Sequence, residues 1–511
     1  MIPASSGQLE AAVPSVPPWR WAPWVPLGWA GLVLACLTVV FVPVRWPFVD
    51  VYEVFYKAYA LPWSQALPDA FGRGLQYRPL FTLLVKAFYD VFDVSLWPYK
   101  TLIVLQQAAV LALFVWTLGA RTRPRALAAV LAVTVVMGLH SSRILFAFFP
   151  IGHHSLALLL LMATVGALLH ERVRRWDRVL GVVALVALLL IEIGVLVPVV
   201  VTAMWLAGAP GVSRRGAAAV WIALAFYVAI RLSFGHSADL ELFSINTGLG
   251  FTPQVSPERL HDIFANAPWW FAAYNVVATT LSVLVSEPRA GVYQFIQDQL
   301  EGRTALWEYL HVCSSLATTI VVVWTVLRWR RMSPRDRLLV VAGGTMFVFG
   351  CGLGFEYARD RMGLTPGLGY AMILYVAAGV LLERAWPRAL GRRSLVRLRA
   401  KRYGETPTKI EERSRGQGGR RVAVLGLVAA LFAVWFVRVV EAGFVLRDTA
   451  WESHLEWTAR WEQLSYGRSH TDMRDRLRAT ALASTPPNPE CDPEWTYQLF
   501  ERAIRAPRCP D

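Results

Sequence analysis

Long apolar runs separated by short polar loops form the main pattern of this chain. Eleven runs predict helices, near residues 25–44, 97–120, 126–140, 153–170, 179–191, 193–209, 217–234, 309–327, 338–352, 366–383 and 422–441. Several of them are shorter than the roughly 20 residues that a standard bilayer crossing needs. We therefore expect some helices that stop short of one membrane face.

Two stretches need a separate interpretation. Residues 179–209 have basic loops on both sides and are too long for one crossing. Two short helices that meet at Glu192 would return the chain to the side from which it entered. The segment 268–286 is apolar enough to cross, but a crossing there would place the basic run 328–337 outside. We therefore predict a re-entrant or interfacial element at this segment.

The predicted fold is an all-α, polytopic transmembrane helix bundle of about eleven spans, with interfacial helices in the first outer loop. We divide the chain into a disordered cytoplasmic tail (1–24), a transmembrane domain (25–385), a basic cytoplasmic loop (386–421), a last transmembrane helix (422–443) and a small extracytoplasmic helical appendage (444–511). Because Lys and Arg accumulate in cytoplasmic loops, the N-terminus should lie inside and the C-terminus outside. The expected location is a bacterial-type inner membrane or a plasma membrane.

The composition supports an integral, multi-pass membrane protein. Of 511 residues, 55% are hydrophobic and 22 are tryptophan, more than a soluble core of this length needs. The net charge of +15 invites a nucleic-acid partner, but thirteen Lys or Arg residues against three acids lie between Arg384 and Arg421. A basic run beside apolar helices is first a topology signal, so we expect membrane lipid and no nucleic acid as a partner.

The polar C-terminal tail contains two of the five cysteines, Cys491 and Cys509. An outward-facing tail lies on an oxidising side, where these two are candidates for a disulfide. No spacing of cysteines and histidines in the chain predicts a zinc site.

The loop after the first apolar run, residues 45–93, holds the polar residues of greatest interest. Asp50 follows the run by a few residues, and Arg78 precedes Pro79, a residue type favoured in the first turn of a helix. A helix from Pro79 would align a polar stripe of Thr82, Lys86, Asp90 and Asp93. One narrow stripe on an otherwise apolar helix is typical of a helix that lies in the membrane interface.

Ionisable side chains near membrane depth are costly and often mark functional sites. Five places qualify: Asp50, Arg78, His153–His154, Glu192 and Arg359–Asp360–Arg361. The predicted topology puts all five at the outer face. There the cations could hold a lipid phosphate, and a carboxylate could accept a proton. Structural roles stay open for each, such as a loop acid, a snorkelling arginine or a carboxylate at a hairpin apex.

These residues lie in short motifs that occur in a characteristic order. An acid just past the first span is followed by YRPLFTLLVKAFYD, then by IEIGVLVPVV, then by RMGLTPGLG. The order resembles that of the multi-spanning glycosyltransferases of the GT-C superfamily, closest to the branch of protein O-mannosyltransferase-like proteins that often carry tetratricopeptide repeats. The resemblance covers roughly residues 25–385 and is carried by Arg78-Pro79-Leu80, Glu192, and Arg361 with Pro366 and Gly369.

The resemblance implies transfer of a sugar from a polyprenyl-phosphate-linked donor on the extracytoplasmic face, with inversion of the anomeric centre. Asp50 would accept the proton of the attacking hydroxyl. The donor phosphate would be bound by Arg78, Arg361, His153 and His154. Glu192 would orient an arginine or the sugar. The lipid phosphate leaves already ionised, so no acid is required opposite the base.

The chain departs from this family in two ways. The second outer loop usually carries a His-Pro and then an acid, whereas LHSSRILFAFFPIGHH has Arg143, given a supporting role here, and two histidines without a carboxylate. The missing carboxylate leaves the role of a metal unassigned, and a divalent metal stays open as a cofactor. The repeats are also missing, which leaves the acceptor unassigned. An inactive or scaffold relative of the same fold remains an alternative, as does a transporter, although transporters often show internal repeats and we find none.

Overall fold

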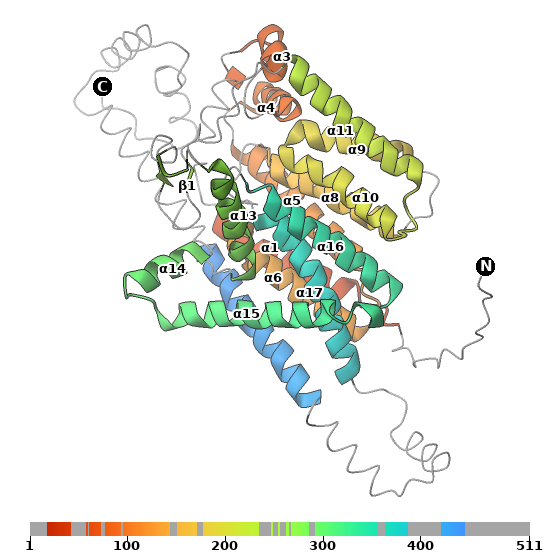
Figure 1. Cartoon of the computed structure of the whole chain (residues 1–511), viewed down its shortest axis with the longest axis vertical. Coiled ribbons are helices and arrows are strands. Elements are labelled where there is room, and N and C mark those ends of the chain that lie inside the picture. The colour runs from red at the N-terminus through yellow and green to blue at the C-terminus, as the bar shows by residue number, and fades with distance from the viewer. Residues whose placement is uncertain are drawn as a thin grey trace, which may run out of the picture.

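The computed structural model is a bundle of helices (Figure 1). It describes residues 18–41, 58–59, 61–72, 77–93, 96–143, 151–170, 177–234, 247–248, 254–255, 262–264, 267–285, 292–355, 363–386, 419 and 421–444. Within these residues the one strand pairing is antiparallel, between β1 (Thr247–Gly248) and β2 (Gln254–Val255). The described part of the chain is otherwise built from helices and turns.

The first half of the bundle consists of α1 (Trp24–Phe41), α3 (Trp63–Gly72), α4 (Pro79–Phe92), α5 (Leu96–Leu118), α6 (Arg123–Gly138), η1 (His140–Arg143), α8 (His153–His170), α9 (Asp177–Leu190), η2 (Glu192–Val195), α10 (Leu196–Leu206) and α11 (Arg214–Phe234). The second half consists of α13 (Pro268–Leu284), α14 (Val292–Leu300), α15 (Leu306–Val326), η3 (Trp329–Arg331), α16 (Pro334–Gly352), α17 (Leu364–Ala385) and the C-terminal helix, Arg421–Phe444.

Six helices in the described part of the chain are long and apolar enough to cross a membrane. They are Trp97–Leu118, His153–His170, Arg214–Ser233, Leu306–Val326, Leu364–Ala385 and Arg421–Phe444. The protein is therefore a helical membrane protein. All eleven predicted apolar runs contain a helix, but five of these helices are shorter or less apolar than the six, so the expected number of about eleven crossings stays a prediction.

The centre of the bundle is α17, of whose apolar span 89% is buried, against 22% for the C-terminal helix. α16 packs closely along it through a pair of glycines. A Cβ atom on Gly369 would lie 2.3 Å from the carbonyl oxygen of Gly343, and a Cβ on Gly343 would lie 2.5 Å from that of Gly369. Small residues at such contacts let helices approach where lipid provides no hydrophobic drive between them.

The two ends of the bundle are connected by α8. Its first residue, His153, lies beside Arg78, and its last, His170, lies 3.2 Å from a guanidinium nitrogen of Arg335. A helix of 18 residues is about 27 Å long, close to the hydrocarbon thickness of a bilayer. We refer to the two ends as the Arg78 end and the basic end.

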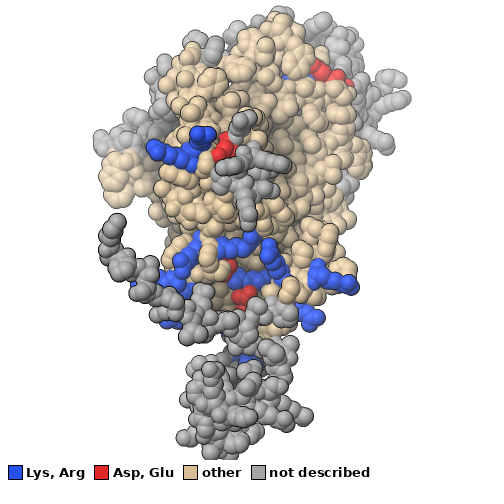
Figure 2. All heavy atoms as spheres, turned by 90° about the vertical axis from the view of Figure 1, so that its right-hand side faces the viewer, with Lys and Arg blue, Asp and Glu red and all other residues tan. Residues whose placement is uncertain are grey.

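Basic side chains gather at the end of the bundle that faces the viewer in Figure 2. This basic end is held together by Arg125 at the start of α6. Its guanidinium donates to both carboxylate oxygens of Asp336 on α16, at 2.9 and 3.0 Å, and to both of Glu383 on α17, at 2.8 and 3.0 Å. One largely buried arginine, 14% exposed, therefore ties three helices together.

Candidate functional site

Arg78 is the residue from which α4 starts. It occupies the N-cap position, and its carbonyl oxygen accepts hydrogen bonds from the backbone N–H and the hydroxyl of Thr82. Pro79 takes the first helical position, where the missing N–H costs nothing. The prediction of a helix beginning at Pro79 is confirmed. Because the side chain of Arg78 makes no cap hydrogen bond, it extends toward α8 and the α9–α10 hairpin instead.

Glu192 lies at the turn of that hairpin. α9 ends at Leu190, and Glu192 opens the short helix η2 before α10 begins. Gly194 permits the tight turn, because a Cβ atom there would lie 2.3 Å from the carbonyl carbon of Ala187. The prediction of two short helices that meet at Glu192 is confirmed.

His153 is held at the start of α8 by the residues around it. Gly152 has φ +56°, a backbone conformation that favours glycine, and a Cβ atom there would lie 2.3 Å from the side-chain oxygen of Gln106. The Gln106 amide donates to the carbonyl oxygen before Gly152 at 2.9 Å. The His153 ring then packs 4.2 Å from the ring of Phe81 and 4.6 Å from that of His154, measured between centroids.

Three of the predicted site residues meet at this point. Arg78 Nε lies 3.0 and 3.3 Å from the two carboxylate oxygens of Glu192, and its Nη2 lies 3.0 Å from one of them. Arg78 Nη1 lies 3.4 Å from Nε2 of His153. The side chains of Arg78 and Glu192 are 21% and 35% exposed, so the pair stays open to solvent or ligand from one side. The carboxylate fixes the plane of the guanidinium, as in other bidentate pairs.

An aromatic platform supports the Arg78 backbone. Tyr77 is buried, and its ring lies 5.8 Å from that of Tyr227 on α11, whose hydroxyl donates to the Tyr77 carbonyl oxygen at 3.4 Å. Burial, reinforced by the nearby Tyr227, raises the pKa of the Tyr77 hydroxyl, so the phenol stays protonated at neutral pH. The platform fixes the backbone from which Arg78 extends.

Arg231 is a second cation of this region, which the sequence reasoning missed. It lies in the last turn of α11, its side chain is half-buried, and it interacts electrostatically with Tyr227, as Arg78 and Glu192 also do. The sequence did contain a signal for Arg231, because it is an arginine at the end of an apolar run. The free-energy cost of placing a charge near membrane depth applies to it as it does to the five places named above.

Part of the polar stripe of α4 packs against the protein, although Asp90 stays exposed. The interfacial position of α4 stays a prediction. Lys86 is buried, and its Nζ donates to the carbonyl oxygen of Ala58 at 2.8 Å and to Asp90 at 2.6 Å. Trp63 of α3 donates its indole N–H to the other oxygen of Asp90 at 2.7 Å. Because the stripe is used to bind the preceding part of the loop, sequence periodicity alone could not tell docking from an interfacial position.

Other predicted residues are not placed by the structure. Asp50, Arg361, Cys491 and Cys509 lie outside the described residues. Arg143 ends η1, and its side chain is outside the described part as well. Among the residues that are described, no three His, Cys, Asp or Glu side chains form a group that could hold a metal ion.

This arrangement can bind an anion. A guanidinium fixed by a carboxylate, a second arginine and a histidine offer several N–H donors in a partly enclosed place, which is the donor set that phosphate oxygens require. No protein-family model, no curated protein and no solved structure matches this chain.

Proposed function

We propose that this protein is a membrane glycosyltransferase that moves a sugar from a polyprenyl-phosphate-linked donor to an acceptor hydroxyl on the extracytoplasmic face. The observation that carries the proposal is the contact of Arg78 with Glu192, 114 residues away, and with His153. Residues that are far apart in the sequence and carry phosphate-binding chemistry meet at one end of the bundle.

The lipid phosphate is bound by Arg78, whose guanidinium is oriented by Glu192, with His153 and His154 beside it. Arg361 joins this set, as its place in the sequence motif implies. Preorganised donors stabilise the charge that develops on the phosphate as the glycosidic bond breaks. The phosphate leaves as an anion, so it needs no proton.

Asp50 acts as the general base in this proposal. The acceptor hydroxyl attacks the anomeric carbon, its proton passes to the Asp50 carboxylate, and the bond from that carbon to the phosphate oxygen breaks. One direct displacement of this kind inverts the anomeric centre. These roles are all assigned to side chains of the protein, and a divalent cation stays open as a cofactor.

The proposed topology has the basic end in the cytoplasm, the N-terminus inside and about eleven crossings. The belt of cations in Figure 2 supports this orientation. In the same topology α13 is an interfacial or re-entrant helix. Its Asn275 donates to the carbonyl oxygen of Phe355 at 3.1 Å, and its Thr279 lies beside Gly354. Gly354 and Phe355 both lie just past the end of α16. These contacts support a position at the Arg78 end rather than a crossing.

Labelled polyprenyl-phosphate sugars added to membranes that contain the protein test this function. Wild type should release free polyprenyl phosphate and label an acceptor, and Asp50→Asn and Arg78→Gln should both lower the transfer rate by about a hundredfold or more. The matched control is Arg331→Gln, which removes an exposed arginine from the basic end. Undiminished transfer in Asp50→Asn would remove Asp50 from the mechanism. Uptake of an intact solute without any sugar transfer would favour the transporter.

A further inference from the structure

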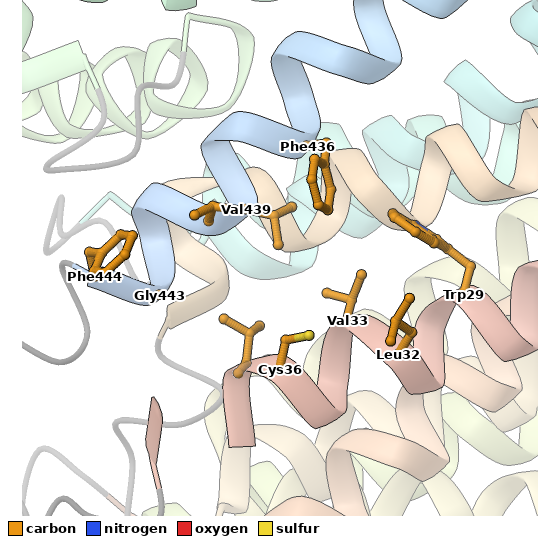
Figure 3. A pocket seen from close by; sticks show the side chains of 10 residues that line it. Trp29, Leu32, Val33, Cys36, Phe436, Val439, Gly443 and Phe444 are labelled. Carbon is orange, nitrogen blue, oxygen red and sulfur yellow. The ribbon is translucent and has the colours of Figure 1, made fainter. Parts of the chain in front are cut away.

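An apolar groove lies between α1 and the C-terminal helix (Figure 3). It has a volume of approximately 220 Å³. Its walls are Trp29, Leu32, Val33, Cys36 and Leu37 of α1, and Phe436, Val439, Val440, Gly443 and Phe444 of the C-terminal helix. The single indole N–H among these side chains already donates to the hydroxyl of Thr134, at 2.9 Å. The one other polar atom among the wall side chains is the Cys36 sulfur, a weak hydrogen-bonding group, so the walls offer little to hold water or to recognise a headgroup.

The two helices touch at both ends of this groove and separate between them. At one end Trp29 packs against Phe432 and Phe436, with ring centroids 5.4 and 5.6 Å apart. At the other end a Cβ atom on Gly443 would lie 3.3 Å from a methyl carbon of Leu37. An empty space between these contacts would leave the lining atoms without van der Waals partners.

The C-terminal helix faces α1 across the groove along one side. Its opposite face is fixed to α15 by Arg438, which is fully buried and donates to the hydroxyl of Ser315 at 2.7 Å. Only 22% of the helix span is buried within the protein. In a bilayer, helix association depends on packing and hydrogen bonds, so whatever fills the groove contributes to holding this helix in place.

We propose that the groove is a binding site for one acyl chain of a membrane phospholipid, which fills the gap and stabilises the C-terminal helix. Several wall residues, among them Leu32, Val440 and Phe444, are 44–56% exposed, so the groove opens sideways to the lipid phase. None of its walls belongs to α4, α8 or the α9–α10 hairpin. A chain bound here is therefore separate from Arg78, Glu192 and His153. Walls that offer no headgroup recognition favour an acyl chain as the occupant, because acyl chains are abundant in the lipid phase.

Two substitutions on neighbouring turns of the same helix provide the test. Val440→Phe fills the groove, whereas Val437→Phe adds the same ring to an exposed valine that does not line it. In native mass spectrometry of the detergent-purified full chain, wild type and Val437→Phe should each keep one tightly bound phospholipid. Val440→Phe should keep about tenfold less of it, as expected for a loss of about 1.4 kcal/mol. Phospholipid added to delipidated protein should raise the melting temperature of wild type and not of Val440→Phe.

Equal phospholipid retention by Val440→Phe and wild type would overturn the proposal. So would retention of polyprenyl phosphate in place of phospholipid, because the occupant would then be the donor chain. Sugar transfer plays no part in either measurement, so the groove and the glycosyltransferase function can fail independently.

Discussion

The two ends of the bundle use arginine in different ways. At the basic end, Arg125 is 14% exposed and makes four hydrogen bonds to two carboxylates, Asp336 and Glu383. At the other end, Arg78 is 21% exposed and has one carboxylate partner, Glu192, with His153 at its remaining side. An arginine held between two carboxylates in this way ties helices together and has little donor capacity left for a ligand. We infer that the arginine suited to bind a ligand is Arg78, because its carboxylate partner orients the guanidinium and does not enclose it.

The largest effect should come from breaking the basic-end clamp. Arg125→Met leaves the carboxylates of Asp336 and Glu383 without their common partner, and the loss of one member of a buried pair costs about 3–5 kcal/mol. We expect a strong fall in the yield of monodisperse protein and in its melting temperature in detergent. Arg121→Gln, an exposed arginine at the same end, is the control. A wild-type melting temperature for Arg125→Met would show that the clamp is dispensable.

Arg78→Gln should have the opposite profile, with activity lost and stability kept. Removing one preorganised donor to a developing charge lowers the rate by about 10²–10³-fold. The partly exposed pair with Glu192 should change the free energy of unfolding by only about 1 kcal/mol or less. Arg78→Lys keeps the charge but lacks the planar guanidinium group. Its transfer rate should therefore lie between those of wild type and Arg78→Gln. The idea fails if Arg78→Gln melts as early as Arg125→Met while its remaining folded fraction transfers sugar normally.

Glu192→Gln tests whether the carboxylate positions Arg78 or binds the sugar. If it positions Arg78, kcat should fall about ten- to a hundredfold because the guanidinium loses its fixed plane. The apparent KM for the anionic donor should stay constant or fall, since the region becomes more positive. A raised KM with unchanged kcat would instead assign Glu192 to sugar binding.

The smallest effect should come from Lys86→Met in the first loop. The substitution removes the donor to the carbonyl oxygen of Ala58 and to Asp90, a loss of about 1–2 kcal/mol. Hydrogen exchange should accelerate in residues 61–72 and leave α6, α16 and α17 unchanged. Thr82→Val, whose hydroxyl bonds only within its own helix, should leave exchange in that segment as it is in wild type. Equal acceleration in both variants would contradict the docking role of Lys86.

The contacts explain why some predictions succeeded and others failed. The start of α4 at Pro79 and the hairpin at Glu192 depend on neighbouring residues, a first-turn proline and a charge inside an apolar run, so the sequence contains their signals. Lys86 donates to the carbonyl oxygen of Ala58, 28 residues earlier, and no local sequence pattern predicts that contact. Arg231 was missed although it stands at the end of an apolar run, and its relevance came from its interaction with Tyr227.

By itself the sequence determined that the chain forms apolar membrane helices, where most of them begin and end, and which loops carry the positive charge. These properties follow from periodicity, helix-start residues and composition, all of which act over a few neighbouring positions. Only the tertiary structure decided that Arg78 pairs with Glu192 while Arg125 is enclosed by two acids. Pairing between distant helices depends on packing geometry, such as the glycine contact of α16 with α17, and the one-dimensional pattern holds no distance between them.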